Sequence, residues 1–247
     1  MKSGNLDSPR TPTATSQRPA ILAAMPAELA SCAPLASRCQ TLLTGVGEAA
    51  ARRAAQVVTA SRKTSLLVSW GTAGGLAPDL KPGTLVICTR IVDAASGRRF
   101  DTPPELVERL MKILAPLRAV RGVGLSVADA VTTRKAKSAL HEAHGCAVTD
   151  MESAAIAICA CEAGIPFLAL RAVIDPAHSN LPTSALAGMA NPEQPTRASL
   201  AALARRPWEL PALCRLALWY RHSLHMLSSA ALMMENAPGL FCGKKSR

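Results

Sequence analysis

The stretch Ala147–Pro176, AVTDMESAAIAICACEAGIPFLALRAVIDP, decides the fold that we predict for this chain. Its alanine-rich middle, Ser153–Glu162, contains no helix breaker and predicts a helix. Gly164 and Pro166 follow, and both are typical of the end of a helix. The apolar run Phe167–Ile174 then predicts a parallel strand that is buried on both faces. The stretch therefore predicts a short strand, a helix and a second strand, which is the repeating unit of an α/β sheet.

Two acidic residues lie where the two strands of this stretch are expected to end. Glu152 follows the first strand and Asp175 follows the second. Ligands of open α/β sheets bind outside the carboxyl ends of the strands, so we expect both carboxylates to line one crevice. Asp150 is expected only to cap the helix.

Two motifs of the chain resemble the purine nucleoside phosphorylase and nucleosidase superfamily. The first is D-M-E-S-A-A at 150–155, followed by L-R-A-V-I-D at 170–175. The second is W-G-T-A-G-G at 70–75, followed by P-D-L-K-P-G at 78–83. The resemblance covers about residues 20–186. It implies a three-layer, nucleoside phosphorylase-like α/β fold with a mixed, mainly parallel central sheet and an all-helical C-terminal extension.

A narrower resemblance rests on the segment R-R-P-W-E-L-P-A-L-C-R-L at 205–216. It is similar to the hopanoid-associated phosphorylases, which are implicated in removing adenine from adenosylhopane during hopanoid biosynthesis. The alternative is a nucleosidase of the 5'-methylthioadenosine/S-adenosylhomocysteine (MTA/SAH) type that acts on small soluble adenine nucleosides. A nucleoside-binding protein without activity is the non-enzyme alternative, but the acidic residues expected for catalysis are present.

The superfamily resemblance implies a role for each of these acidic residues. Asp175 matches the acid that protonates the departing purine, and Glu152 is expected to hold the ribose hydroxyls. Met25 and Glu28 match the M-x-x-E spacing with which nucleosidases present the carboxylate that activates water. A glutamate at a helix start also complements the helix dipole, so the residues alone leave both interpretations open. The next elements follow Glu28 sooner than in the family, which predicts that a strand pair is missing there.

Three further residues are expected to contact the nucleoside. Thr72, beside Gly71 in a predicted turn at 71–75, occupies the position where relatives place a hydroxyl near the ribose and the nucleophile. A threonine in a tight turn also often bonds only its own backbone. Met151 belongs to the same motif as Glu152. Val131 stands where relatives stack an aromatic residue on the base, which predicts an altered base pocket.

A second glycine motif, Gly45-Val46-Gly47, lies between a predicted strand and a helix predicted at 48–61. In isolation this pattern is typical of a dinucleotide site. Such a site requires an acidic residue about 20 residues later, at the end of the next strand, and Leu66–Trp70 offers none. We therefore expect Gly45 and Gly47 to bring backbone N–H groups close to an anion or a bound water.

The sequence leaves the acceptor of the glycosyl group open. No arginine clearly matches those that clamp phosphate in other phosphorylases, although Arg98 and Arg99 in the loop 93–103 are candidates. Water activated by Glu28 is the other possibility. We expect no cofactor beyond phosphate as a co-substrate, and no metal.

Composition predicts one domain without a membrane span. The 247 residues fit a single α/β domain at 20–190, with a disordered tail at 1–19 and a helical extension of the same domain at 191–247. No apolar run reaches the ~18 residues typical of a membrane helix. The eight cysteines are expected to be buried, reduced thiols of a cytoplasmic protein. Although the net charge is +11, the sequence has no recognisable nucleic-acid-binding motif, so we expect no nucleic acid as a partner. The superfamily resemblance implies a nucleoside as the partner, and we expect the chain to form a homo-oligomer.

The predicted helical tail, from about residue 183 to 234, carries an amphipathic stripe. Its members recur at three- and four-residue spacing: Leu213, Leu216, Ala217, Tyr220, Leu224 and Leu227. We expect this stripe to pack on the domain. The alternative is contact with the inner membrane face through tryptophans and basic residues: Trp208, Arg215, Trp219, Arg221, Lys244 and Lys245.

Overall fold

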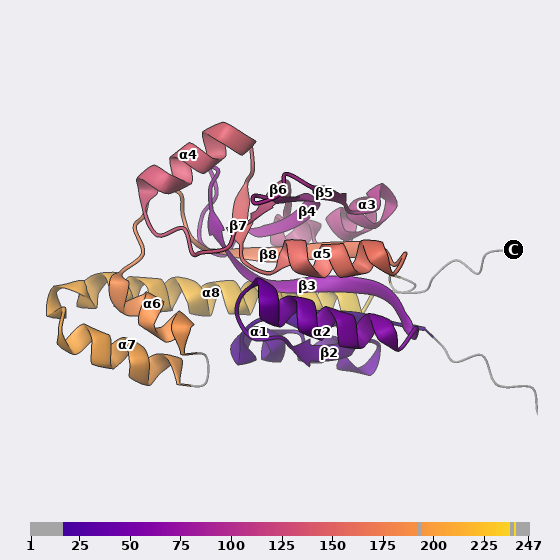
Figure 1. Ribbon diagram of the computed structural model, residues 1–247, viewed down its shortest axis with the longest axis horizontal. Coiled ribbons are helices and arrows are strands. Elements are labelled where there is room, and N and C mark those ends of the chain that lie inside the picture. Colours follow the sequence, from indigo (N-terminus) through magenta and orange to yellow (C-terminus); the bar gives the residue numbers. More distant parts are fainter. Residues whose placement is uncertain (1–16, 192–193, 238–239, 241–247) are drawn as a thin grey trace, which may run out of the picture.

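The computed structural model describes residues 17–191, 194–237 and 240 (Figure 1). The first strand begins at Arg18, two residues before the expected start of the domain at residue 20. The rest of that predicted tail, residues 1–16, lies outside the described residues.

The described strands form one mixed sheet whose pairings are mainly parallel, as predicted. The strands are β1 (Arg18–Ala23), β2 (Gln40–Leu43), β3 (Thr64–Gly75), β4 (Leu85–Asp93), β5 (Arg99–Asp101), β6 (Val120–Ser126), β7 (Val148–Asp150) and β8 (Phe167–Asp175). β2, β1, β3 and β8 are successive parallel neighbours. β8 then pairs antiparallel with β4, and β4 pairs in parallel with β6. β6 pairs in parallel with β7, and β7 pairs antiparallel with β3. Five strands therefore close a ring, and β1, β2 and β5 extend from it.

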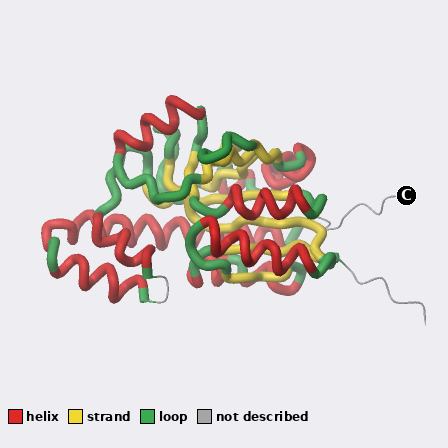
Figure 2. Tube along the Cα trace, in the orientation of Figure 1, coloured by secondary structure: helices red, strands yellow, loops and turns green. Residues whose placement is uncertain are grey.

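Helices cover both faces of the sheet and give the predicted three layers (Figures 1 and 2). They are α1 (Pro26–Ser31), α2 (Glu48–Ala60), α3 (Pro104–Ile113), α4 (Arg134–His144), α5 (Ser153–Glu162), α6 (Thr183–Ala190), α7 (Pro195–Ala204) and α8 (Leu210–Glu235), with short 3-10 turns at η1 (Ala33–Ser37), η2 (Ala115–Leu117) and η3 (Pro207–Glu209). α2 and α5 share one core cluster, α3, α8 and the residues around η1 share a second, and a smaller third one includes Leu125 of β6. No strand pair separates α1 from β2, as expected from the short spacing after Glu28.

The core follows from the alternation of side chains along the strands. In β1, Ala20 and Leu22 pack against α2 and α5, whereas Ile21 and Ala23 pack toward α8. α5 is buried along almost its whole length, so its sequence is apolar all round instead of amphipathic. Its bounds and those of β8 match the prediction closely.

Two local predictions were wrong. The glycine segment 71–75 is no turn but the end of β3, because it pairs with β8 on one side and with β7 on the other. The loop 93–103 contains the strand β5, which pairs with β4.

Cysteines were also expected to be buried, yet Cys161 and Cys214 are exposed; Cys242 lies outside the described residues.

The amphipathic stripe of α8 packs on the domain, as predicted. Leu216 and Leu227 are buried, and Ser223 Oγ donates a hydrogen bond to the carbonyl of Val173 in β8 (2.7 Å), although Ala217 is exposed. α6, α7 and the first turns of α8 extend beyond the sheet, at the left of Figure 1. No helix in the described ranges is long and apolar enough to cross a membrane.

Candidate active site

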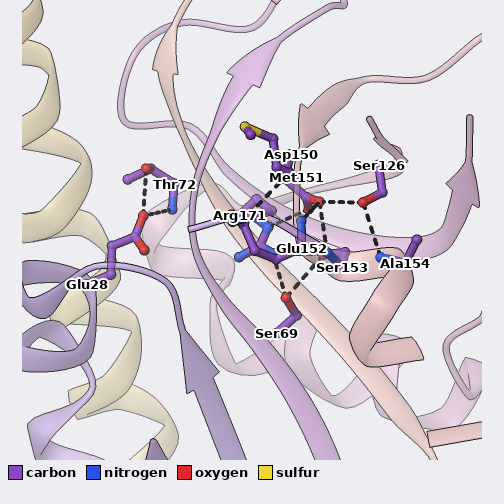
Figure 3. A network of polar contacts seen from close by, with 11 residues as sticks. Glu28, Ser69, Thr72, Ser126, Asp150, Met151, Glu152, Ser153, Ala154 and Arg171 are labelled. Atoms are coloured by element: carbon purple, nitrogen blue, oxygen red, sulfur yellow. Dashed lines mark hydrogen bonds and ion pairs between the residues drawn. The ribbon is translucent and has the colours of Figure 1, made fainter. Parts of the chain in front are cut away.

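Glu28 is held in the first turn of α1 by donors from β3. Its side chain is buried, at 4% exposure. Oε1 accepts hydrogen bonds from the Thr72 amide (2.8 Å) and the Thr72 hydroxyl (2.7 Å; Figure 3). Oε2 accepts one from the Met25 amide (3.2 Å). The Thr72 hydroxyl therefore bonds a carboxylate and not its own backbone. These three donors fix the Glu28 carboxylate, with two on Oε1 and one on Oε2.

Gly71 makes this arrangement possible. A Cβ atom at this position would lie 2.9 Å from the carboxyl carbon and from both oxygens of Glu28. Only a residue without a side chain lets the strand approach the carboxylate so closely. The neighbouring Trp70 anchors α1 to β3, because its indole N–H donates to Ser31 Oγ (2.9 Å).

Glu152 lies at the start of α5 and receives two backbone amides. Oε1 accepts from Gly47 (2.7 Å) and Oε2 from Met151 (3.2 Å). Gly47 has φ +92°, a conformation that favours glycine and turns its amide toward the carboxylate. The anion expected at Gly47 is thus Glu152 itself, whereas the Gly45 amide has no such contact in the described structure. Burial, followed by the charge of Asp150, raises the pKa of Glu152 to about 7, against the effect of the Gly47 amide.

A buried ion pair between Arg171 and Asp150 supports Glu152. Arg171 donates through Nε to Asp150 (2.8 Å) and through Nη2 to Ser69 Oγ (2.5 Å) and Ser153 Oγ (2.7 Å). Asp150 also accepts from the amides of Glu152 and Ser153 at the start of α5, although Glu152 itself occupies the N-cap position (Figure 3). Although burial opposes it, the Arg171 charge and these hydrogen bonds hold the pKa of Asp150 below its usual range.

Glu28 and Glu152 line one small cavity together with Thr72, Trp70 and Arg171. Its volume is about 20 Å³, which is room for roughly one water molecule. Two carboxylates, a hydroxyl and a guanidinium therefore converge on a space of molecular size. A nucleoside is much larger, so binding one requires the surrounding loops to open.

Asp175 is not among the residues that line this small cavity. It is 2% exposed and forms an ion pair with Lys137 of α4. The Lys137 ammonium also donates to the carbonyls of Pro176 (3.0 Å) and Ser179 (3.2 Å). Burial raises the pKa of Asp175 to about 6, and the Lys137 charge limits the rise. Asp175 pairs with Gly74 of β3, whose other neighbour is Thr149 of β7, the strand that leads to Glu152.

The remaining expected site residues fall into two groups. Val131 is half-buried in the loop before α4, and the carbonyl of its neighbour Thr132 accepts from the Leu181 amide (2.8 Å), so it lies beside the loop that follows Asp175. Arg98 and Arg99 are exposed on the β4–β5 hairpin, where Arg98 stacks on the Phe100 ring (5.1 Å). The structure does not bring these two arginines to the cavity.

Sequence reasoning missed Arg171 and Lys137. Arg171 is quoted within the motif 170–175, and a cation inside a buried apolar strand is itself a signal, because it must be paired. Lys137 gives no such signal, since a lysine in the polar first turns of α4 resembles any solvated helix residue.

Comparison with known proteins decides the family. The family model described as the phosphorylase superfamily matches residues 37–204. The chain belongs to the phosphorylase superfamily. The match includes Thr72, Glu152 and Asp175, whereas Glu28 precedes it. This superfamily membership confirms the predicted enzyme class.

One curated relative is 29% identical over an alignment of 161 residues, and the match covers 56% of this chain and 67% of the relative. It is a 5'-methylthioadenosine/S-adenosylhomocysteine nucleosidase of Shewanella oneidensis. This match supports the resemblance to MTA/SAH nucleosidases, and it does not show the narrower resemblance to the hopanoid-associated phosphorylases.

Solved structures confirm the nucleoside phosphorylase-like fold of this superfamily member. The nucleosidase of the same name from Neisseria meningitidis has a TM-score of 0.67 at 18% identity, covering 90% of this chain and 100% of that one. The one from Helicobacter pylori has a TM-score of 0.65 at 16% identity, covering 87% and 96%. The futalosine hydrolase of Helicobacter pylori has a TM-score of 0.63 at 17% identity, covering 87% and 97%.

Proposed function

We propose that this superfamily member hydrolyses the N-glycosidic bond of a small adenine nucleoside, as an MTA/SAH-type nucleosidase, and releases free adenine. The observation that carries the proposal is the pair of carboxylates, Glu28 and Glu152, on one cavity of water-molecule size. The curated relative from Shewanella oneidensis bears the corresponding name.

The chemistry assigns each acidic residue a different task. Cleavage makes the sugar carbon positive and the purine negative. Glu28, held by Thr72, takes a proton from the attacking water, and ionised Glu152 stabilises the developing sugar cation and binds ribose hydroxyls. Asp175 protonates the departing base, a step that general acid catalysis makes worth ~10²–10⁴ in rate. Met151 and Val131 are assigned to the walls of the nucleoside site.

Water is the favoured acceptor over phosphate. The cavity between the carboxylates holds roughly one water, and phosphate there would meet two negative charges. Its cation, Arg171, is already paired with Asp150, and Arg98 and Arg99 lie on a distant hairpin. We therefore propose that no phosphate, metal or other cofactor takes part.

The experiment incubates the purified chain with adenosine, MTA and SAH, each with and without phosphate, and follows adenine by chromatography. We expect adenine and free ribose products at the same rate in both buffers. Glu28→Gln is expected to lose at least ~10² in rate, because the amide cannot accept the water's proton. Glu48→Gln, which changes an exposed glutamate of α2, is the matched control. Ribose 1-phosphate as the product would overturn hydrolysis, and no adenine from any nucleoside would overturn the whole proposal.

Adenosylhopane is a second candidate substrate, supported by the surface of the helical extension. Trp208 is 72% exposed and Leu218 is 64% exposed. The exposed Arg215, which stacks on Trp219 (5.3 Å), and the exposed Arg221 add positive charge. Lys244 and Lys245, named for the same contact, lie outside the described residues.

A lipid-linked substrate requires docking on the cytoplasmic leaflet. Each basic residue near an anionic surface contributes about 1 kcal/mol to the binding free energy. We expect salt-sensitive flotation with anionic liposomes but not with neutral ones. Charge reversal at Arg215 and Arg221 should abolish it while adenosine cleavage in solution is unchanged. Equal binding to both kinds of liposome would contradict a role of the helical extension in docking on anionic membranes.

We further propose that the chain acts in the cytoplasm as a homo-oligomer. The support is apolar surface at one edge of the sheet, where Leu43 of β2 and Val57 of α2 are exposed. Light scattering after size-exclusion chromatography gives the mass. A single-chain mass at micromolar concentration would contradict the proposal.

A further inference from the structure

Lys137 is a buried lysine whose hydrogen-bonding capacity is completely used. Its side chain is 0% exposed. The ammonium has three donors and no acceptor, and it contacts three acceptors: Asp175 Oδ2 and the carbonyls of Pro176 and Ser179. A lysine is almost never fully buried unless it is paired. The pair with Asp175 thus accounts for its position.

The same lysine joins the loop after β8 to the start of α4. Two further bonds run between these segments: the Leu181 amide donates to Thr132, and the Arg134 amide donates to Asn180 Oδ1 (2.7 Å). The loop carbonyls bound by Lys137 belong to Pro176, which directly follows Asp175, and to Ser179, three residues further along. Lys137 therefore fixes both the carboxyl group and the chain that leaves it.

The two oxygens of Asp175 have different surroundings. Oδ2 contacts Lys137, whereas Oδ1 faces Gly74 of β3, lying 3.5 Å from the position that a Cβ atom would take there. A glycine leaves space beside Oδ1 that any other residue would fill. On its other side β3 pairs with β7, the strand that leads to Glu152.

We propose that Lys137 is a positioning residue for Asp175, which fixes the carboxyl group through Oδ2 and leaves Oδ1 as the oxygen that gives its proton to the leaving base. This inference rests on the proposed role of Asp175 as general acid. The proton moves from Oδ1 to the purine as the glycosidic bond breaks, and the resulting carboxylate remains paired with the Lys137 ammonium. The lysine thus stabilises the product form of the acid and strengthens it as a proton donor.

The charges around Asp175 make this role testable by pH. Among the described residues, Lys137 is the charged group that acts on Asp175; β3 presents Gly74 and Gly75, and the loop presents carbonyl groups. An opposite charge at hydrogen-bond distance lowers the pKa of a carboxyl group by about 1–3 units. Removing the cation should therefore raise the pKa of Asp175.

The experiment compares Lys137→Met with Lys135→Met, which removes an exposed lysine from the same helix. The titration of the Asp175 carboxyl group is followed by ¹³C NMR, with Asp175→Asn for assignment. We expect its midpoint to rise by at least about one pH unit in Lys137→Met and to stay unchanged in Lys135→Met. Lys137→Gln, which keeps a hydrogen bond without the charge, replaces Lys137→Met if the latter does not fold. An unchanged midpoint in the Lys137 variant would overturn the inference.

Kinetics then separates this inference from the proposed function. In Lys137→Met, the alkaline limb of adenine release should move upward with the titration, which a purely structural role would not cause. Cleavage of 4-nitrophenyl riboside, whose leaving group departs without a proton, should be largely retained in both Lys137→Met and Asp175→Asn. A wild-type chain that releases no adenine refutes the proposed function, while the titration still reports on the pair. If the wild type is active and the pH profile of adenine release is unchanged in Lys137→Met, the inference is refuted while the proposed function stands.

Discussion

The two carboxylates of the cavity and the carboxylate of Asp175 are held by different donors. Glu28 and Glu152 accept from neutral groups, namely the amides of Thr72, Met25, Gly47 and Met151 and the Thr72 hydroxyl. Asp175 accepts instead from the ammonium of Lys137. Neutral donors fix a carboxylate without cancelling its charge, as a base or a cation stabiliser requires. A cationic partner suits an acid that must become an anion during the reaction.

The largest expected effect tests the Asp175 side of this comparison. Asp175→Asn keeps the shape of the side chain but has no acidic proton, so adenine release should fall by ~10²–10⁴ while nucleoside binding is largely kept. Chromatography measures the release, and equilibrium dialysis with adenosine measures the binding. Near-normal turnover would remove Asp175 from the mechanism.

A smaller loss is expected on the other side. Glu152→Gln removes the charge that faces the sugar cation and half of the acceptor capacity for ribose hydroxyls. We expect KM to rise and kcat to fall, each by about 10- to 100-fold, the value of a hydrogen bond to a charged group. The discrimination between adenosine and 2'-deoxyadenosine should shrink in the variant. If the preference for ribose is unchanged, Glu152 does not bind the hydroxyls.

A matched pair of glycine variants in β3 compares the two regions within one strand. Gly71→Ala places a methyl group 2.9 Å from the Glu28 carboxylate, so we expect a loss of stability of about 1–3 kcal/mol together with reduced activity. At Gly74 the nearest atoms lie at 3.3 and 3.5 Å, from Thr149 and Asp175, so Gly74→Ala should cost less. Denaturant unfolding measures both. Equal losses would show that backbone effects, and not the carboxylate, decide the outcome.

The mildest test uses pH alone. Glu152 acts ionised, so activity is lost as the pH falls below its pKa of about 7. Asp175 acts protonated, so activity is lost as the pH rises above its pKa of about 6. Activity follows the fraction of ionised Glu152 multiplied by the fraction of protonated Asp175. This product gives a bell-shaped pH profile with its maximum between pH 6 and 7, and activity falls about tenfold per pH unit further out on each side. A plateau extending above pH 8 would contradict the assignment of the acid.

The sequence predicted the parts of this molecule that depend on local pattern. α5 and β8 follow from an alanine-rich segment, its glycine and proline stop and an apolar run, and Glu152 and Asp175 are placed at their ends. Whether a strand pairs parallel or antiparallel, and with which partner, depends on distant segments. This is why the glycine segment of β3 was taken for a turn.

The side-chain partners of the acidic residues were equally hidden. The contact of Lys137 with Asp175 spans 38 positions and requires α4 to fold back over the loop after β8. Asp175 was therefore placed correctly at a strand end, but its pairing with Lys137 was not foreseen.

The ring formed by β3, β8, β4, β6 and β7 has a consequence for solubility. Strands inside the ring have neighbours on both sides, so β2 and β5 are the edge strands of the described sheet. Such edges can pair with another chain and start aggregation, and proteins protect them with short strands and charges. β2 has four residues and β5 has three, and β5 begins at the exposed Arg99 and ends at Asp101. The sheet therefore offers little template for edge-to-edge association, even at concentrations where longer free strands would polymerise.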